Sequence, residues 1–127
     1  MSTAWTPREL ALLGGARSLV LSAGDGGHPG VEVGMVVVRG ALLVRAQRGT
    51  GSLWYRAARE SGRGRVRVGA TDREVLLETG HERPAEAIDA AYRAKYGAAA
   101  VLLTGPDAHA ATVRIRPVAS GPTAGRG

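Results

Sequence analysis

The chain has 127 residues and a formal net charge of +6, and 44% of its residues are hydrophobic. This length suits one domain with a real core, which we expect to be aliphatic because there are only two tryptophans, three tyrosines and no phenylalanine. The absence of cysteine excludes disulfides and thiolate metal sites. The three histidines are far apart in the sequence, so we expect no metal site.

The apolar and charge patterns restrict the location and the partners of the protein. No apolar stretch approaches the roughly 20 residues of a membrane span and no signal peptide is visible, so we expect a cytoplasmic protein with no membrane partner. The positive charge is compatible with nucleic-acid binding, but acidic residues are interleaved with the arginines. No predicted strand carries an aromatic side chain for base stacking, so we expect no nucleic-acid partner.

The first predicted elements are a helix and a strand. Thr6 and Glu9 have the spacing of a capping box, and Pro7 suits the first helical position. The helix is expected to end at the glycine pair 14–15. The following segment, 17–23, is predicted to be a strand.

Two further strands are predicted at 31–38 and 41–46. Arg39 and Gly40 between them favour a tight turn, so the two strands should form a hairpin. The first strand becomes solidly apolar toward its end, which is typical of a central strand covered on both faces.

A short helix is predicted at 52–61, and Gly62 ends it. Helical periodicity places Trp54 and Leu53 on one face, and we interpret Trp54 as a core anchor. Tyr55 lies on the other face and is expected to be exposed, partly covered by an arginine, or at a dimer interface.

Two alternating segments, 64–69 and 74–79, predict the next pair of strands. Arginines alternate along the first of them, and they either face a ligand or pair with acidic residues of the second. We favour the pairing, which joins Arg63, Arg65 and Arg67 to Glu74 and Glu78.

The clearest helix is predicted at 84–97, between a proline and a glycine. Asp89 and Arg93 have the i,i+4 spacing of an ion pair on this helix. A last alternating strand is predicted at 111–117.

These elements occur in the order helix, three strands, helix, two strands, helix and strand. Mostly antiparallel neighbours with short turns imply a small barrel with helices packed outside it, as one domain over residues 1–118. Residues 119–127 are predicted to be a disordered tail.

A candidate anion site lies before the 52–61 helix. Arg45 and Arg48 lead into a glycine loop at 49–51, and a helix N-terminus after such a loop offers free N–H groups to an anion. An ordinary strand-to-helix turn has the same local sequence, so both interpretations stay open. The sequence shows no catalytic triad, no working carboxylate pair and no cysteine nucleophile, so any chemistry would depend on a cofactor.

A resemblance to a known family is carried by "LLVRAQRGTGSLWYRAARESGRGRVRVGATDREV", "AIDAAYRAKYG" and "ATVRIRP". From Trp5 to Pro117, the chain resembles an uncharacterised bacterial family, best known from actinobacteria, of the flavin-binding split-barrel superfamily (pyridoxamine-phosphate-oxidase-like). More distantly, "LLVRAQRGTGSLWYRAA" is similar to the deazaflavin-dependent nitroreductases.

The resemblance implies a fold that is mainly β with flanking helices, a six-stranded antiparallel split β-barrel. It also implies a homodimer with cofactor sites at the subunit interface, FMN or a deazaflavin coenzyme as cofactor, and a small-molecule substrate. The cofactor-binding residues carried over from it are Arg45, Ala46, Arg48, Gly49, Trp54 and Arg56. The candidates for a substrate pocket are Tyr92, Lys95 and Tyr96.

One segment departs from the pattern of that superfamily. Basic residues on the strand matching 31–38 usually hold the cofactor phosphate, whereas this strand has no Arg, Lys, Ser or Thr and contains Glu32. A carboxylate there would repel a phosphate. Two functions therefore stay open. One is a flavin- or deazaflavin-dependent oxidoreductase that transfers hydride to a small organic acceptor; the other is a cofactor-free protein that binds or converts a small metabolite, for example in a biosynthetic pathway.

Overall fold

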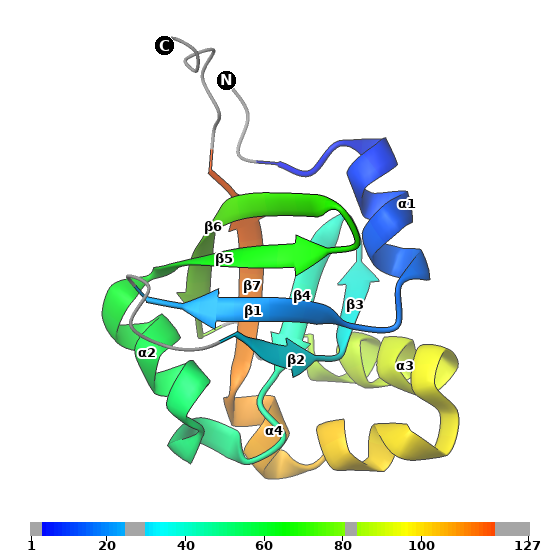
Figure 1. The fold of residues 1–127 in the computed structure, drawn as a ribbon. Helices are drawn as coiled ribbons and strands as arrows, with labels where there is room; N and C mark the ends of the chain where they lie inside the picture. The colour runs from blue at the N-terminus through cyan, green and yellow to red at the C-terminus, as the bar shows by residue number, and fades with distance from the viewer. Residues whose placement is uncertain (1–3, 25–29, 81–83, 119–127) are drawn as a thin grey trace, which may run out of the picture.

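The computed structural model describes residues 4–24, 30–80 and 84–118, which form a barrel-like antiparallel sheet with helices around it (Figure 1). The strands are β1 (Leu19–Ala23), β2 (Val31–Val33), β3 (Met35–Val38), β4 (Ala41–Arg45), β5 (Arg63–Val68), β6 (Thr71–Thr79) and β7 (Thr112–Pro117). The helices are α1 (Pro7–Gly15), α2 (Leu53–Ser61), α3 (Ala85–Tyr96) and α4 (Pro106–Ala110), with 3₁₀ segments η1 (Gly49–Gly51) and η2 (Gly97–Leu103). None of the described helices is long and apolar enough to cross a membrane.

A single bent run of chain closes the barrel. The strand order is β2-β1-β5-β6-β7-β4-β3, so the two edges of the sheet, β2 and β3, are neighbours in the sequence and are separated only by Gly34. β2 pairs with β1 and β3 pairs with β4. The described sheet therefore has seven strands and not the expected six, because the segment 31–38 turns at Gly34 and forms both edge strands.

Side chains of α3 hold the bend at Gly34. The Tyr92 hydroxyl donates to the Gly34 carbonyl at 3.1 Å, and the Tyr96 hydroxyl accepts from the Met35 amide at 2.9 Å. A Cβ at Gly34 would lie 3.2 Å from the Tyr96 ring, which is closer than ordinary van der Waals contact. The two phenols thus supply the hydrogen bonds that the sheet loses where the strand turns.

The core has two parts, and β3 and β4 take part in both. Alternate side chains of all seven strands, such as Leu42 and Val44, point into the barrel. Val36 and Leu43 point outward, where they pack with Ile88 and other residues of α3 and η2. The apolar run predicted for this region is therefore covered on both faces, although β3 is an edge strand.

Several local predictions are confirmed. Thr6 and Glu9 form the capping box of α1, with hydrogen bonds of 3.1 and 2.8 Å between each side chain and the other residue's amide. Arg39 and Gly40 form the β3–β4 turn with φ angles of 53° and 81°. Gly62 ends α2 in the left-handed conformation, with φ of 70°. Segment η2 and helix α4 were not expected from the sequence.

The predicted faces of α2 are wrong. Tyr55 is buried in the barrel core and Leu53 is 75% exposed, while Trp54 is only partly buried. The ring belongs to the core cluster of the barrel, and the Tyr55 hydroxyl lies 3.5 Å from the Ala110 carbonyl. Helical periodicity separates the faces of a short helix, but it does not say which face meets the sheet when both carry apolar residues.

The charge pairs on the outer face of the sheet also differ from the expectation. Arg65 lies directly opposite Glu74, yet its guanidinium pairs diagonally with Asp72 at 3.0 Å. Glu78 pairs across β6–β7 with Arg116 at 3.5 Å. Long arginine side chains reach diagonal neighbours as readily as direct ones, which the register alone does not reveal.

Candidate functional site

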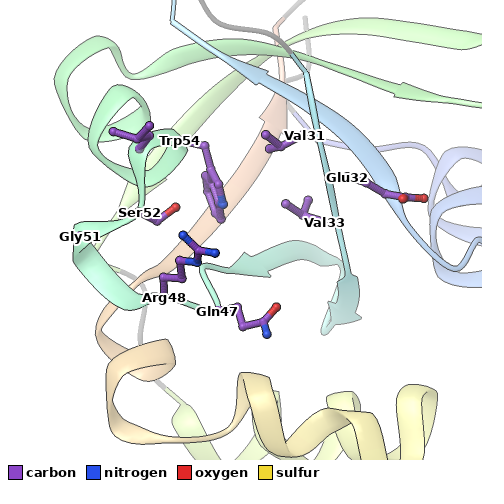
Figure 2. A pocket seen from close by; sticks show the side chains of 9 residues that line it. Val31, Glu32, Val33, Gln47, Arg48, Gly51, Ser52 and Trp54 are labelled. Atoms are coloured by element: carbon purple, nitrogen blue, oxygen red, sulfur yellow. The ribbon is translucent and has the colours of Figure 1, made fainter.

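An open pocket lies between β2 and the segment that joins β4 to α2 (Figure 2). Its volume is about 540 Å³, which falls within the roughly 300–1,000 Å³ of small-molecule sites. One wall consists of residues 31–33, and the other consists of residues 47–48 and 51–54.

The segment after β4 is folded tightly against α4. The Ala46 amide donates to the Ala111 carbonyl at 3.1 Å, and the Gly49 amide donates to the Ala46 carbonyl at 2.9 Å. Gly49 has φ of 73°, a left-handed conformation that favours glycine, and a Cβ there would lie 3.1 Å from the Cβ of Asp107. The chain then enters α2, whose N-terminus lies at the pocket.

Arg48 and Trp54 lie close together in the pocket. The Arg48 side chain points toward the indole, and Val31 and Val33 point toward the same ring from β2 (Figure 2). Among the described residues that line the pocket, Arg48 is the only cationic one. A guanidinium beside aromatic and aliphatic surfaces suits a planar ligand that carries an anionic group.

Ser52 and the first turn of α2 add hydrogen-bond donors to this pocket. Ser52 precedes α2, but its side chain makes no capping hydrogen bond. The first N–H groups of an α-helix have no partner within the helix, and the positive end of the helix dipole lies beside them. Together with Arg48, they form a wall that favours an anion.

Glu32 turns away from the pocket. Its carboxylate lies on the other side of β2, where the Ser18 hydroxyl donates to it at 2.6 Å (Figure 2). Alternation along the strand directs Val31 and Val33 to the opposite face. Glu32 is the one acidic residue among the described residues that line the pocket, and its carboxylate points away from the cavity, so it is poorly placed to repel a phosphate there.

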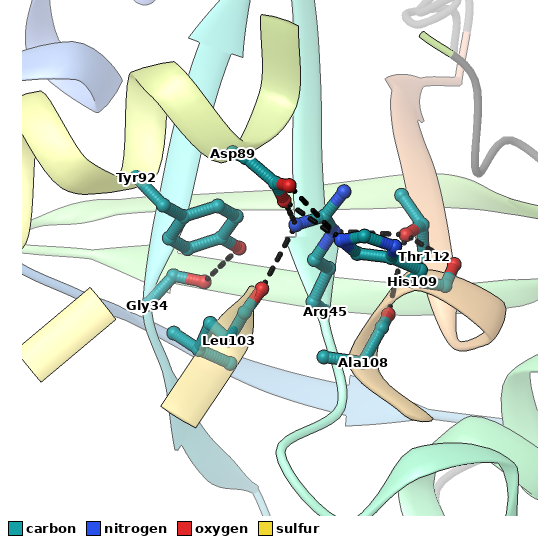
Figure 3. A network of polar contacts seen from close by, with 8 residues as sticks. All are labelled: Gly34, Arg45, Asp89, Tyr92, Leu103, Ala108, His109 and Thr112. Atoms are coloured by element: carbon teal, nitrogen blue, oxygen red, sulfur yellow. Dashed lines mark hydrogen bonds and ion pairs between the residues drawn. The ribbon is translucent and has the colours of Figure 1, made fainter. Parts of the chain in front are cut away.

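Arg45 lies in a buried polar network and not in the pocket (Figure 3). It is 1% exposed, and its Nη1 lies 2.5 Å from a carboxylate oxygen of Asp89. Its Nε donates to the Thr112 hydroxyl at 3.0 Å. The Nε2 atom of His109 lies 2.9 Å from the same Asp89 oxygen. Asp89 is therefore engaged by two basic side chains here and not by Arg93 as expected.

The other candidate cofactor residues lie in different environments. Ala46 and Gly49 are buried behind the loop, and Arg56 is exposed on α2 outside the pocket lining. Of the six residues, the structure brings Arg48 and Trp54 together at the pocket. Within the described ranges, no three His, Asp or Glu side chains gather as a metal site.

Tyr92, Lys95 and Tyr96 lie at the barrel corner and not at the pocket. The Lys95 ammonium donates to the Met35 carbonyl at 2.8 Å, beside the phenols that hold Gly34. Burial lowers the pKa of Lys95, and the nearby Arg17 lowers it further. Burial raises the pKa of both tyrosines, with neighbouring Tyr96 adding to the effect on Tyr92.

The strand 31–38 was expected beside the cofactor, but sequence reasoning missed that Val31 and Val33 face the pocket, and it missed the Asp89–His109 contact. The first had a signal, because the valines at 31 and 33 flank Glu32 and must share a face in a strand. The second had none, because the two residues are 20 positions apart and belong to different helices.

Three solved structures share this fold at low sequence identity. A conserved hypothetical protein from Mycobacterium tuberculosis has a TM-score of 0.59 and 14% identity, over 93% of this chain and 83% of that one. A putative pyridoxamine 5'-phosphate oxidase from Listeria innocua has a TM-score of 0.57 and 15% identity, over 87% of this chain and 90% of that one. An FAD-binding protein from Mesorhizobium loti has a TM-score of 0.52 and 15% identity, over 90% of this chain and 89% of that one.

These likenesses show the fold alone: the chain has a barrel architecture similar to those of the three proteins. No curated protein matches the sequence. The model of a family described as uncharacterized proteins conserved in bacteria, DUF2255, matches residues 16–115. The chain therefore belongs to the bacterial DUF2255 family.

Proposed function

We propose that the protein is a flavin- or deazaflavin-dependent oxidoreductase that transfers hydride between its cofactor and a small organic acceptor. The observation that carries the proposal is the convergence of Arg48 and Trp54 in an open pocket whose opposite wall is aliphatic. Two proteins with a similar fold are named as a putative pyridoxamine 5'-phosphate oxidase and as an FAD-binding protein, which agrees with this reading.

The pocket residues divide the tasks of binding a planar, phosphate-bearing cofactor. Val31, Val33 and the Trp54 indole would contact the ring system. Arg48, Ser52 and the first amides of α2 would hold the phosphate through charge-assisted hydrogen bonds. The cofactor supplies the hydride chemistry, while the chain binds it, orients it and excludes water from it.

We further propose that the functional unit is a homodimer in which a second subunit covers the open side of the pocket. Leu53 lines the pocket and is 75% exposed in the single chain. A large apolar side chain at the rim of a site is typical of a surface that a partner buries.

A binding titration tests the proposed function. Purified protein is titrated with FMN, FAD and a deazaflavin coenzyme, and Trp54 fluorescence reports binding because its indole lies in the pocket. Trp5, which is 8% exposed and donates to the Ile115 carbonyl, is replaced in a Trp5→Phe variant to remove its background signal. We expect binding of at least one of the three in the micromolar range.

Replacing Arg48 is the matched test of the site. Arg48→Ala is expected to weaken cofactor binding by roughly tenfold, because a charge-assisted hydrogen bond to the phosphate is lost. Arg59→Ala, an equally drastic change on the exposed face of α2, should leave the affinity unchanged. If wild-type protein binds none of the three compounds, the proposal is wrong and the cofactor-free function remains.

A further inference from the structure

The buried network around Arg45 is linked to the pocket through α4. Asp89 comes from α3, Arg45 ends β4, and His109 comes from α4, so one carboxylate joins three elements (Figure 3). Arg45 Nη1 also donates to the Leu103 carbonyl at 2.8 Å, which adds η2 to the same cluster. None of these side chains lines the pocket.

The position of α4 depends on such contacts. This helix has five residues and no side-chain cap at its N-terminus, and an isolated helix of this length is not stable in water. Within this helix, the Ala108 side chain is buried. The His109 ring, with its side chain 32% exposed, lies 2.9 and 3.1 Å from the two Asp89 oxygens and is the polar contact that ties α4 to α3.

The pocket loop in turn rests on α4. Gly49 packs against Asp107, two residues before His109, so closely that a Cβ would approach its Cβ to 3.1 Å. The Ala111 carbonyl, directly after α4, accepts the Ala46 amide at 3.1 Å. Arg48 and Ser52, the polar residues of the pocket wall, flank this supported segment.

We infer that His109 and Asp89 are positioning residues of the pocket: their contact holds α4 so that the loop 46–52 presents Arg48 and Ser52 to an anionic ligand. The inference rests on the proposed function for the nature of the ligand, but the coupling of His109 to the loop exists without it. His109 acts through α4, because its ring does not reach the pocket.

The test compares His109→Ala with His109→Gln in the full chain. Glutamine keeps an N–H donor at about the same distance from the backbone as the histidine Nε2. Alanine removes the contact with Asp89. We measure amide hydrogen exchange of Gly49, Gly51 and Ser52 in ligand-free protein, with amides of β1 and β5 as the internal reference. His109→Ala should speed exchange in the loop by roughly tenfold with the reference unchanged, and His109→Gln should restore it. Arg93→Ala, an exposed change one turn from Asp89 on α3, is the control and should have no effect.

The same variants are then titrated with FMN and with the deazaflavin coenzyme. His109→Ala should bind more weakly by roughly tenfold and His109→Gln within about twofold of wild type. Loop exchange that is equal in His109→Ala and wild type overturns the inference. If wild type binds no flavin but the loop exchange changes as expected, the proposed function fails and the positioning role stands. Should His109→Ala not fold, His109→Asn, whose amide is too short for the contact, replaces it.

Discussion

The guanidinium of Arg45 is buried, with hydrogen-bond acceptors around two of its nitrogens. The Asp89 carboxylate, the Leu103 carbonyl and the Thr112 hydroxyl accept its hydrogen bonds. Its guanidinium carbon lies 5.7 Å from the centroid of the Tyr92 ring, within range of a cation–π contact. A buried charge is tolerated when it is paired and hydrogen-bonded. The contacts of Nε and Nη1 meet this condition, whereas Nη2 has no hydrogen-bond partner among the described residues.

Removing one partner of the buried pair should therefore be costly. Arg45→Met is expected to lower the free energy of unfolding by about 3–5 kcal/mol, because the Asp89 carboxylate loses its main partner. Arg48→Met, an exposed arginine three residues later, should change it by less than about 0.5 kcal/mol. Urea denaturation of both variants measures the difference.

The single variant Asp89→Leu and the double variant Arg45→Met/Asp89→Leu, together with Arg45→Met, make a double-mutant cycle. The double variant removes both charges, so it should be more stable than Arg45→Met alone. A double variant that is destabilised by the sum of the two single changes would show that the ion pair carries no coupling.

At the scale of elements, the corner between β2 and β3 depends on α3. The strand is interrupted at Gly34, and the Tyr92 and Tyr96 hydroxyls pair with the carbonyl and the amide of the Gly34–Met35 peptide. Tyr96 also donates to the Arg17 carbonyl at 2.7 Å, which ties the end of α1 to the same corner. Helix α3 thereby holds the bend between β2 and β3, which a continuous strand would have kept in line.

The corner predicts a specific loss of stability in alkali. Burial raises the pKa of Tyr92 in the folded protein above its ordinary value of 10.0. The unfolded chain releases this proton first, so stability is full below pH 10 and falls as the pH rises further, by up to about 1.4 kcal/mol per pH unit. Tyr92→Phe should cost about 1 kcal/mol at neutral pH and lose this part of the alkaline slope.

Urea denaturation between about pH 9 and pH 11 measures both slopes. Tyr96 adds a slope of the same sign, and Lys95 adds one of opposite sign because burial lowers its pKa and stability rises as the pH approaches 10.5. Tyr96 and Lys95 are present in both wild type and Tyr92→Phe. The difference between the two alkaline slopes therefore isolates the contribution of Tyr92. Equal alkaline slopes in wild type and Tyr92→Phe would contradict the role given to its hydroxyl.

At the scale of the whole molecule, closure of the barrel creates the pocket. Its two walls are residues 31–33 and residues 47–54, which lie on opposite sides of the β3–β4 hairpin in the sequence. The bend at Gly34 leaves β2 facing the start of α2 across the open pocket (Figure 2). The pocket is therefore a property of the nearly closed sheet and not of the glycine loop by itself.

The proposed homodimer gives a prediction at this scale. Leu53→Glu should shift the protein from dimer to monomer, because a carboxylate at the rim would be buried in the interface. Val101→Glu on η2, where the valine is 73% exposed, is the matched control and should leave the mass unchanged. Analytical ultracentrifugation at micromolar concentration measures both, and a wild-type protein that is monomeric there would refute the dimer.

Much of the fold could be predicted because its signals are local. The capping box of α1, the turn at Arg39–Gly40 and the end of α2 at Gly62 each depend on a few adjacent residues. Less of the site could be predicted. Arg48 and Trp54 were expected at a cofactor and do line the pocket, but Arg45 was expected beside them and is buried with Asp89.

The amino-acid sequence by itself determined helices α1, α2 and α3, the alternating strands, a largely aliphatic core and the glycine loop before α2, since backbone preferences and periodicity act over short distances. Only the tertiary structure decided which face of α2 meets the barrel, that the segment 31–38 serves both edges of the sheet, and that Glu32 points away from the pocket. Each of these depends on contacts between residues far apart in the chain. Burial and pairing there outweigh local propensity, so no short stretch of sequence records the outcome.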